Sequence, residues 1–224
     1  MMPTRFRDRS EAGRLLARKL RRYASLSDVL VLALPRGGVP VGFEIAKALH
    51  APLDVFVVRK LGVPGHEELA MGAITTGGVR VLNRSIVEEL GITEDQIELI
   101  AAEEEHELKR RELRYRGTRP APVLHHRTVI LVDDGIATGA TMRAALAALR
   151  EHQAARLIVA VPVAPVSTMQ QLAAEGVETV CVLSVESFIA IGVWYEDFSQ
   201  ISDEEVCRLL QEASCELSAQ SLPV

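Results

Sequence analysis

Two adjacent carboxylates, followed by small residues and hydroxyls, are the part of this sequence best suited to chemistry. The apolar run TVILV leads into Asp133 and Asp134 and then into the segment GIATGAT. Where a helix follows a strand, its first backbone amides are unpaired and lie at the positive end of the helix dipole, which favours an anion. Small side chains leave such amides open, and threonines add hydroxyl donors. We therefore expect a monophosphate to bind at Thr138, Gly139, Ala140 and Thr141.

The paired acids call for a different ligand. Carboxylates repel a phosphate, but they accept hydrogen bonds from vicinal hydroxyls, and they also suit a divalent cation. A phosphate and a diol at this separation describe a ribose 5-phosphate. The structural alternative is an acidic strand end followed by a helix that Thr141 caps. That alternative explains Asp133 and Asp134 alone better than it explains the whole string.

A second candidate site is the sequence PRGG, which follows the apolar run at 29–34. Paired glycines permit positive φ and close backbone approach, and an arginine supplies a charged fork. Arg36, Gly37 and Gly38 are therefore candidates for binding a further phosphate group, and a tight turn with a solvated arginine is the alternative. Arg59 and Lys60 follow the next strand-like run. On their own they are equally well explained as surface cations.

Other site motifs fit this sequence poorly. It has no G-x-x-x-x-G-K-[ST] phosphate loop, and no G-x-G-x-x-G follows a strand, which disfavours P-loop hydrolases and the dinucleotide fingerprint. His66, Glu67 and Glu68 have no second cluster at ligand spacing. We therefore interpret them as part of a loop or a substrate rim rather than a metal site.

The elements that must position these residues alternate along the chain. Strands are expected at 29–34, 53–58, 128–133, 157–161 and 179–183, with a hairpin at 71–75 and 79–82. Helices are expected at 11–23 behind an N-cap at Ser10, and at 39–50, 85–90, 93–115, 166–174 and from 202. Apolar strands separated by helices predict a parallel sheet covered on both faces, with ligands beyond the carboxyl ends of its strands. The segments 35–38, 59–70 and 133–141 follow such ends.

Composition limits the class of protein. A chain of 224 residues can form one sizeable core, and we expect a single domain over 1–224, with residues 218–224 as a frayed tail. The net charge of -5 makes a nucleic-acid partner a poor fit, and the basic run at 18–22 is interpreted as a solvated helix face. Three cysteines without CxxC spacing are typical of reduced thiols in a cytoplasmic protein. No apolar stretch is long enough to span a membrane.

The strand followed by Asp-Asp-Gly-Ile-Ala-Thr-Gly-Ala-Thr resembles the phosphoribosyl-pyrophosphate (PRPP) signature of the type I phosphoribosyltransferases. The resemblance covers roughly residues 10–200 in element order. It implies an α/β fold, with a doubly wound, mainly parallel sheet, helices on both faces and a small hood. It also implies that Asp133 and Asp134 bind the ribose 2- and 3-hydroxyls while residues 137–141 wrap the 5-phosphate. Ala137 stands where 6-oxopurine members carry an aspartate, so it resembles the adenine and orotate branches.

The resemblance also assigns roles to the loops. The PRGG segment resembles the pyrophosphate loop of the family, which often contains a non-proline cis peptide. A flexible loop at about 59–70 would close over PRPP and bring Arg59 and Lys60 to the pyrophosphate. A hood at about 184–200, with the terminal segments, would cover the acceptor base. Phe188, Trp194 and Tyr195 are its candidate contacts, and core packing is the alternative for each aromatic ring.

The implied reaction is transfer of a 5-phosphoribosyl group from PRPP to a nitrogenous acceptor such as a nucleobase, as in purine or pyrimidine salvage, with release of pyrophosphate. Asp133 and Asp134 would hold the sugar, while Arg36, Arg59 and Mg²⁺, held mainly by PRPP, would stabilise the leaving group. Two alternatives stay open. The protein could be a non-catalytic regulator that senses PRPP or a nucleotide, or a phosphate-ester hydrolase with Asp133 as nucleophile. A homodimer through the charged helix at 93–115 also stays open.

Overall fold

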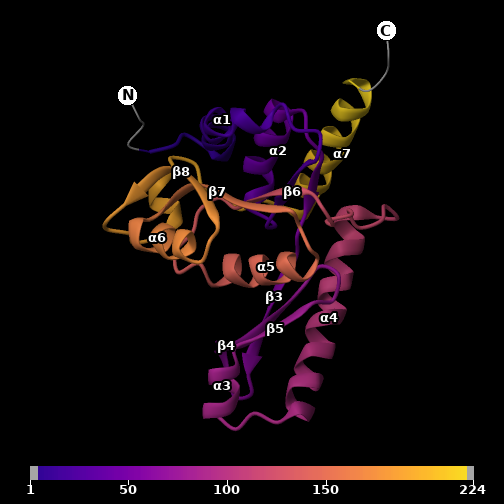
Figure 1. Ribbon diagram of the computed structural model, residues 1–224, viewed down its shortest axis with the longest axis vertical. Coiled ribbons are helices and arrows are strands. Elements are labelled where there is room, and N and C mark those ends of the chain that lie inside the picture. The colour runs from indigo at the N-terminus through magenta and orange to yellow at the C-terminus, as the bar shows by residue number, and fades with distance from the viewer. Residues whose placement is uncertain (1–4, 221–224) are drawn as a thin grey trace.

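A parallel sheet forms the core of the molecule, as the alternating pattern predicts. The computed structural model describes residues 5–220, apart from the side chains of Glu68, Ala219 and Gln220. The sheet has the order β2-β1-β6-β7-β8, and helices cover both of its faces (Figure 1). Its strands are β1 (Val29–Ala33), β2 (Leu53–Val55), β6 (Thr128–Val132), β7 (Arg156–Pro165) and β8 (Glu178–Val185). The helices are α1 (Arg9–Lys19), η1 (Arg21–Tyr23), α2 (Gly38–Leu49), α5 (Ala140–Glu151), α6 (Val166–Ala174), η2 (Ile191–Trp194) and α7 (Asp203–Gln220).

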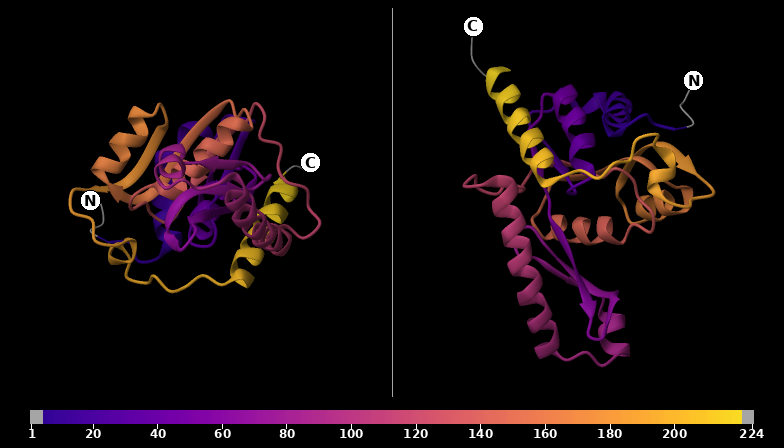
Figure 2. Two further views of the ribbon diagram at one scale, coloured as in Figure 1. Left: turned by 90° about the horizontal axis from the view of Figure 1, so that it is seen from below. Right: turned by 180° about the vertical axis from the view of Figure 1, so that it is seen from behind.

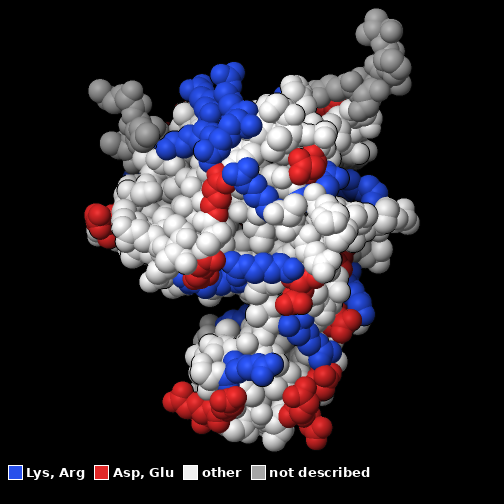
Figure 3. All heavy atoms as spheres, in the orientation of Figure 1, with Lys and Arg blue, Asp and Glu red and all other residues white. Residues whose placement is uncertain are grey.

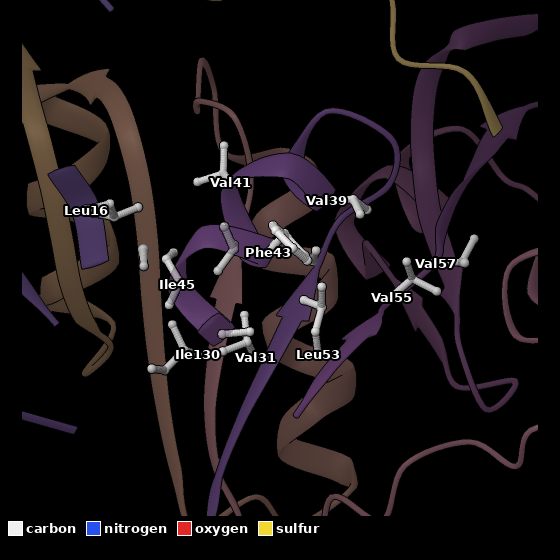
Figure 4. Close-up of a cluster of buried hydrophobic side chains, with 14 of the residues drawn as sticks. Leu16, Val31, Val39, Val41, Phe43, Ile45, Leu53, Val55, Val57 and Ile130 are labelled. Atoms are coloured by element: carbon white, nitrogen blue, oxygen red, sulfur yellow. The ribbon is translucent and has the colours of Figure 1, made fainter. Parts of the chain in front are cut away.

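The central strands β1 and β6 are buried along their whole length. Successive side chains point to opposite faces, so each strand contributes to two apolar clusters. Val31 and Ile130 join the cluster beneath α1, α2 and α7, where Phe43 and Ile45 of α2 lie beside them (Figure 4). Leu131 faces the other way, into the cluster beneath α5 and α6. Burial on both faces explains why these strands are continuously apolar in sequence.

A second unit, which we call the lobe, consists of residues 58–116 and projects from the parallel sheet (Figure 1). It contains a three-stranded antiparallel sheet of β3 (Val58–Val63), β4 (His66–Thr75) and β5 (Arg80–Leu82), followed by α3 (Arg84–Glu89) and α4 (Glu94–Arg116). A capping box between Thr93 and Gln96 starts α4. The fold is thus an α/β parallel sheet with a small additional antiparallel sheet.

A buried ion pair joins the end of the lobe to the core. Arg116, at the last turn of α4, is 7% exposed and donates from Nε to Asp54 Oδ1 of β2 at 3.0 Å. Its other nitrogens donate to Glu112 Oε1 at 3.0 Å and to the carbonyl oxygen of Val55 at 2.6 Å. These contacts fix the base of α4 beside the edge strand of the parallel sheet.

Most predicted elements are confirmed, including the β4–β5 hairpin and helices α2, α4 and α6, whose bounds lie within one residue of those expected. The prediction of an irregular segment at 59–70 is wrong, because β3 and β4 pair with each other within it. Its glycines and its proline occupy a bulge and a turn, which do not break the pairing. The predicted strand at 53–58 is correspondingly divided between β2 and β3.

The predicted ends of the chain also need correction. Helix α1 begins at Arg9 rather than Glu11, because Asp8, and not Ser10, is the N-cap and accepts from the backbone N–H of Glu11 at 2.7 Å. At the other end α7 continues to Gln220, so residues 218–220 are helical; residues 221–224 of the expected tail lie outside the described residues.

Residues 186–202, which we call the strap, run from β8 to α7 around the outside of the parallel sheet (Figure 2). The strap contains only the short helix η2 and one isolated bridge, from Tyr195 to Phe6. Residues 184–200 therefore form no separate sheet, and the antiparallel sheet of this fold lies in the lobe instead.

The basic residues at 18–22 lie exposed on α1 and η1, as a solvated helix face should, and Lys and Arg gather over this part of the molecule (Figure 3). Among the described residues, no helix combines the length and the apolar character that crossing a bilayer requires.

Candidate functional site

The two candidate loops meet at the carboxyl edge of the parallel sheet. Ala33 and Val132 are paired at the ends of β1 and β6, so the chain leaves both strands side by side. A Cβ added at Gly37 would lie 2.0 Å from Asp134 Oδ2, and one at Gly38 would lie 2.7 Å from the carbonyl oxygen of Val132. The paired glycines are thus required where one loop crosses the other. The expected cis peptide is present between Pro35 and Arg36.

Arg36 is half-buried, and it is close enough to Tyr115 near the end of α4 for the two to interact electrostatically. Burial and a hydrogen bond to Asp203 raise the pKa of Tyr115 to about 12, and the positive charge of Arg36 opposes this rise. The base of the lobe therefore lies beside the PRGG loop.

The expected phosphate segment leads into α5 without a side-chain cap. Gly139 is the N-cap in a left-handed conformation, with φ of 79°, and no side chain of the described residues caps the first amides. The alternative that Thr141 caps the helix is therefore wrong. The carbonyl oxygens of Ala137 and Thr138 accept from Thr168 Oγ1 and from an Arg143 guanidinium nitrogen, each at 2.9 Å. With the exception of Gly139, residues 137–141 are exposed. This geometry offers the amides of the first turn to an anion.

The paired acids have different surroundings. Asp133 is half-buried, and its Oδ1 accepts from the backbone N–H of Asp134 at 2.8 Å. Burial and the neighbouring charge of Asp134 raise the pKa of the Asp133 carboxyl well above its ordinary value. Asp134 is 7% exposed and its Oδ2 accepts from Arg9 Nε at 2.8 Å. Burial raises its pKa too, and Arg9 opposes the rise. Asp133 is therefore the more exposed residue of the pair, whereas the Asp134 carboxylate is buried against Arg9.

The expected acceptor contacts lie on the strap but differ in access. Tyr195 is 3% exposed and donates its hydroxyl to the carbonyl oxygen of Asp134 at 2.6 Å. Its ring is therefore unavailable for stacking on a base, which corrects that expectation. Phe188 and Trp194 are half-buried and pack against the core beneath α2. Trp194 Nε1 is buried and has no hydrogen-bond partner within the described residues.

Arg59 and Lys60 lie on β3, in a cleft between the lobe and α5. The cleft has a volume of about 640 Å³, and Ala140 and Thr141 line its opposite wall. Arg59 donates from Nε to Glu104 Oε2 of α4 at 2.6 Å. The structure thus brings these cations to the cleft at the start of α5, but their cleft does not include Arg36, Gly37 or Gly38.

Arg9 is the contact that the sequence did not suggest. Its partner Asp134 is 125 residues away, and no local pattern links the two. A basic residue in the first turn of a helix usually opposes the helix dipole, which is a weak sign that Arg9 has another role.

The described residues contain no group of three or more His, Cys, Asp or Glu side chains that could hold a metal ion. His66 and Glu67 lie exposed on β4, at the far end of the lobe's sheet.

The family model described as phosphoribosyl transferase domain matches residues 8–193. Two curated relatives from Mycobacterium tuberculosis, strains CDC 1551 / Oshkosh and ATCC 25618 / H37Rv, carry the name "Putative phosphoribosyl transferase" and are 46% identical over 208 residues. That match covers 93% of this chain but 47% of theirs, so the chain spans about half the length of the curated relatives it matches.

Two solved structures show the same fold. The crystal structure of TT1426 from Thermus thermophilus is 42% identical, with a TM-score of 0.82 over 93% of this chain and 98% of that one. A hypothetical protein from Neisseria gonorrhoeae, solved with bound ppGpp, has a TM-score of 0.51 over 95% of this chain and 98% of that one; at 16% identity it shares the fold alone.

Proposed function

This chain belongs to the phosphoribosyl transferase domain family, and from that premise we propose that it transfers the 5-phosphoribosyl group of PRPP to a nitrogenous acceptor and releases pyrophosphate. One observation carries the proposal: α5 begins at Ala140 without a side-chain cap, at the end of the loop that opens with the half-buried Asp133. An open helix N-terminus suits the 5-phosphate, and a carboxylate beside it suits the ribose hydroxyls.

In the proposed complex the 5-phosphate binds the amides and hydroxyls of residues 138–141. Asp133 accepts hydrogen bonds from the ribose hydroxyls, and Asp134 supports it from the interior. This arrangement holds C1 of the sugar above the carboxyl edge of β1 and β6, next to the PRGG loop. Positioning of this kind supplies much of the rate enhancement when two bound groups must react.

The leaving pyrophosphate gains negative charge as the bond to C1 breaks. Arg36 belongs to the PRGG loop itself, and its guanidinium stabilises that charge. Mg²⁺ bound to the pyrophosphate supplies further neutralisation. The ion would be held mainly by PRPP itself. Arg59 contacts the pyrophosphate only after its ion pair with Glu104 has broken.

The acceptor is proposed to be a nucleobase that lacks the 6-oxo group. Ala137 provides no carboxylate at the position where 6-oxopurine enzymes of this family have one, and it is exposed at the site. Phe188 and Trp194 remain the proposed acceptor contacts from the strap.

A second candidate function is binding of PRPP without turnover. The observation that favours it is that Asp134 and Arg59 are both engaged by other side chains, Arg9 and Glu104. A regulator needs the phosphate and ribose contacts but not the catalytic ones.

Incubation of the protein with labelled PRPP, Mg²⁺ and a panel of bases separates these functions. Transfer predicts pyrophosphate release that depends on one base, together with a labelled nucleotide. Tight PRPP binding with no product for any base supports the regulator. Release of inorganic phosphate, abolished in Asp133→Asn, supports the hydrolase and contradicts both.

A further inference from the structure

Arg9 is a buried cation that the proposed reaction leaves without a role. It is 8% exposed and lies in the first turn of α1. Its Nε donates to Asp134 Oδ2 at 2.8 Å, and its Nη1 donates to the carbonyl oxygen of Ser199 at 2.9 Å. The guanidinium also lies 3.9 Å from the centre of the Phe198 ring, within the range of a cation–π contact. Burying a charge is costly, and these separate contacts indicate that this one is held in a fixed place.

Arg9 links the strap to the paired acids. Phe6 and Tyr195 form a bridge, in which the Phe6 N–H donates to the carbonyl oxygen of Trp194 and the Glu196 N–H donates to that of Phe6, both at 2.8 Å. Tyr195 then donates its hydroxyl to the carbonyl oxygen of Asp134. The chain before α1, the strap and the acid pair are thus one connected network. It lies against the PRGG loop, since a Cβ added at Gly37 would meet the Asp134 carboxylate.

Arg9 is also the countercharge of the acid pair. The groups that face Asp134 are Asp133 from the same loop, Arg9 from α1 and the Tyr195 hydroxyl from the strap. Burial raises the pKa of Tyr195, so its hydroxyl stays neutral. Arg9 alone among them opposes the raised pKa of both carboxyls. An ionised carboxylate accepts hydrogen bonds only, which is the state that ribose hydroxyls require.

We propose that Arg9 is a positioning residue for the ribose site, which holds Asp134 beneath Gly37 and Asp133 and ties strap residues 195–199 to the same point. It acts through Asp134 and does not itself touch the substrate. The inference rests on the proposed function, because it assumes that PRPP binds at residues 133–141.

The test is the affinity for Mg²⁺–PRPP, measured by calorimetry from acid to mildly alkaline pH. Arg9→Met removes the charge and keeps the length, Arg9→Lys keeps the charge but not the fork, and Arg18→Met is the control because Arg18 is exposed on the same helix. We expect Arg9→Met to weaken binding at neutral pH by about tenfold, the equivalent of one pKa unit. Arg9→Lys recovers part of this loss, and Arg18→Met binds as the wild type does.

The pH profile separates this role from a general structural one. Binding needs ionised acids, so affinity falls as the pH drops through their raised pKa values. Without Arg9 those values rise further, and the midpoint of the fall moves to higher pH. The ionisation of PRPP is the same in every experiment. The ratio of the variant's PRPP affinity to that of the wild type therefore reports only the titrating groups of the protein. A loss by the same factor at every pH, or no loss at all, overturns the proposal.

Two further outcomes are decisive. If Arg9→Met does not fold, the double variant Arg9→Met/Asp134→Asn removes both charges and avoids an unpaired buried carboxylate. We expect it to fold and to bind PRPP about tenfold more weakly than the wild type; wild-type affinity in it contradicts a positioning role. If the wild type itself fails to bind PRPP, the proposed function falls and this inference falls with it. If the wild type binds PRPP and the Arg9 variants bind it equally well, only the inference about Arg9 is contradicted and the proposed function stands.

Discussion

Asp133 and Asp134 are neighbours in the chain but have different environments. Asp133 is half-buried beside the open turn before α5, and Asp134 is buried against Arg9. Identical side chains can therefore take different roles, one as a ligand for the sugar and the other as its support. This difference is set by the fold around each carboxyl, because the sequence DDG contains nothing that distinguishes the two.

Asp133→Asn should weaken PRPP binding and stabilise the protein at pH 8. The pKa of Asp133 is raised in the folded protein, chiefly by burial, so its proton stabilises the fold at low pH and that contribution is lost as the pH rises through the raised pKa. Asparagine removes the buried charge, so the melting temperature of the variant should exceed that of the wild type at pH 8. This difference in melting temperature should shrink as the pH falls.

Thermal melts at several pH values measure whether the melting temperature of Asp133→Asn lies above that of the wild type. Asp28→Asn is the control, because a hydrogen bond from Thr128 lowers the pKa of Asp28 and the loss of its charge should bring no stabilisation. A melting temperature for Asp133→Asn that lies below the wild type at pH 8 contradicts the burial argument.

Gly37→Ala tests the crossing of the two loops. The new Cβ would lie 2.0 Å from Asp134 Oδ2, so the PRGG loop or the acid must move. We expect a loss of about 1–3 kcal/mol in unfolding free energy, as for other overpacked sites, and a weaker affinity for PRPP. Denaturant titration and calorimetry measure the two effects. Gly65→Ala is the control for affinity, since its Cβ meets nothing within 4 Å and the residue is far along the lobe, although its φ of 75° makes alanine cost stability there too; equal losses of PRPP affinity in both variants contradict the account.

At the scale of elements, the start of α5 is the feature on which the proposed phosphate binding depends. Ala140→Asp places a carboxylate in the first turn, where it stabilises a helix by about 0.3–1 kcal/mol through the dipole. The same charge repels a phosphate. We expect stability to stay level or rise while PRPP affinity falls at least about tenfold, because like charges 4 Å apart repel by about 1 kcal/mol per pair even in water. Ala140→Asn is the neutral control, and retained binding in Ala140→Asp excludes this turn as the phosphate site.

The ion pair between Arg59 of β3 and Glu104 of α4 tests whether the lobe takes part. If Arg59 turns to the pyrophosphate, Glu104→Gln releases it in advance and should raise PRPP affinity by up to about fivefold, since a surface pair is worth roughly 0–1 kcal/mol. Glu98→Gln, which releases Arg80 from a similar pair on the same helix, should change nothing. Unaltered affinity in Glu104→Gln shows that Arg59 keeps its place in the cleft.

Elements were easier to predict from the sequence than their contacts. The apolar runs of β1 and β6 act locally, and the strands predicted from them are confirmed. The segment 59–70 was misjudged because glycine and proline permit a bulge and a turn as readily as a loop. The Arg9–Asp134 pair and the burial of Tyr195 depend on residues more than sixty positions apart, which no periodicity or spacing can show.

At the scale of the whole molecule, the lobe and the core must keep a fixed relation if Arg36 is to lie beside α4. Arg116 maintains it through Asp54, Glu112 and the Val55 carbonyl oxygen. Arg116→Met leaves two carboxylates without their cation and should lower the unfolding free energy by about 3–5 kcal/mol. That corresponds to about 2–4 °C in melting temperature per kcal/mol for a chain of this size.

Differential scanning calorimetry measures this loss. Arg119→Met is the control, because Arg119 is exposed and donates to backbone carbonyl oxygens, so a change within about 0.5 kcal/mol is expected. A loss in Arg116→Met no larger than in the control contradicts the anchoring role.

The central claim is that residues 133–141 hold the ribose 5-phosphate part of PRPP. A crystal structure of the protein with Mg²⁺ and PRPP tests it most directly. The account predicts the 5-phosphate on the amides of residues 138–141, the ribose hydroxyls on the Asp133 carboxylate and Asp134 still paired with Arg9. PRPP bound elsewhere, with the first turn of α5 open to solvent, would contradict it.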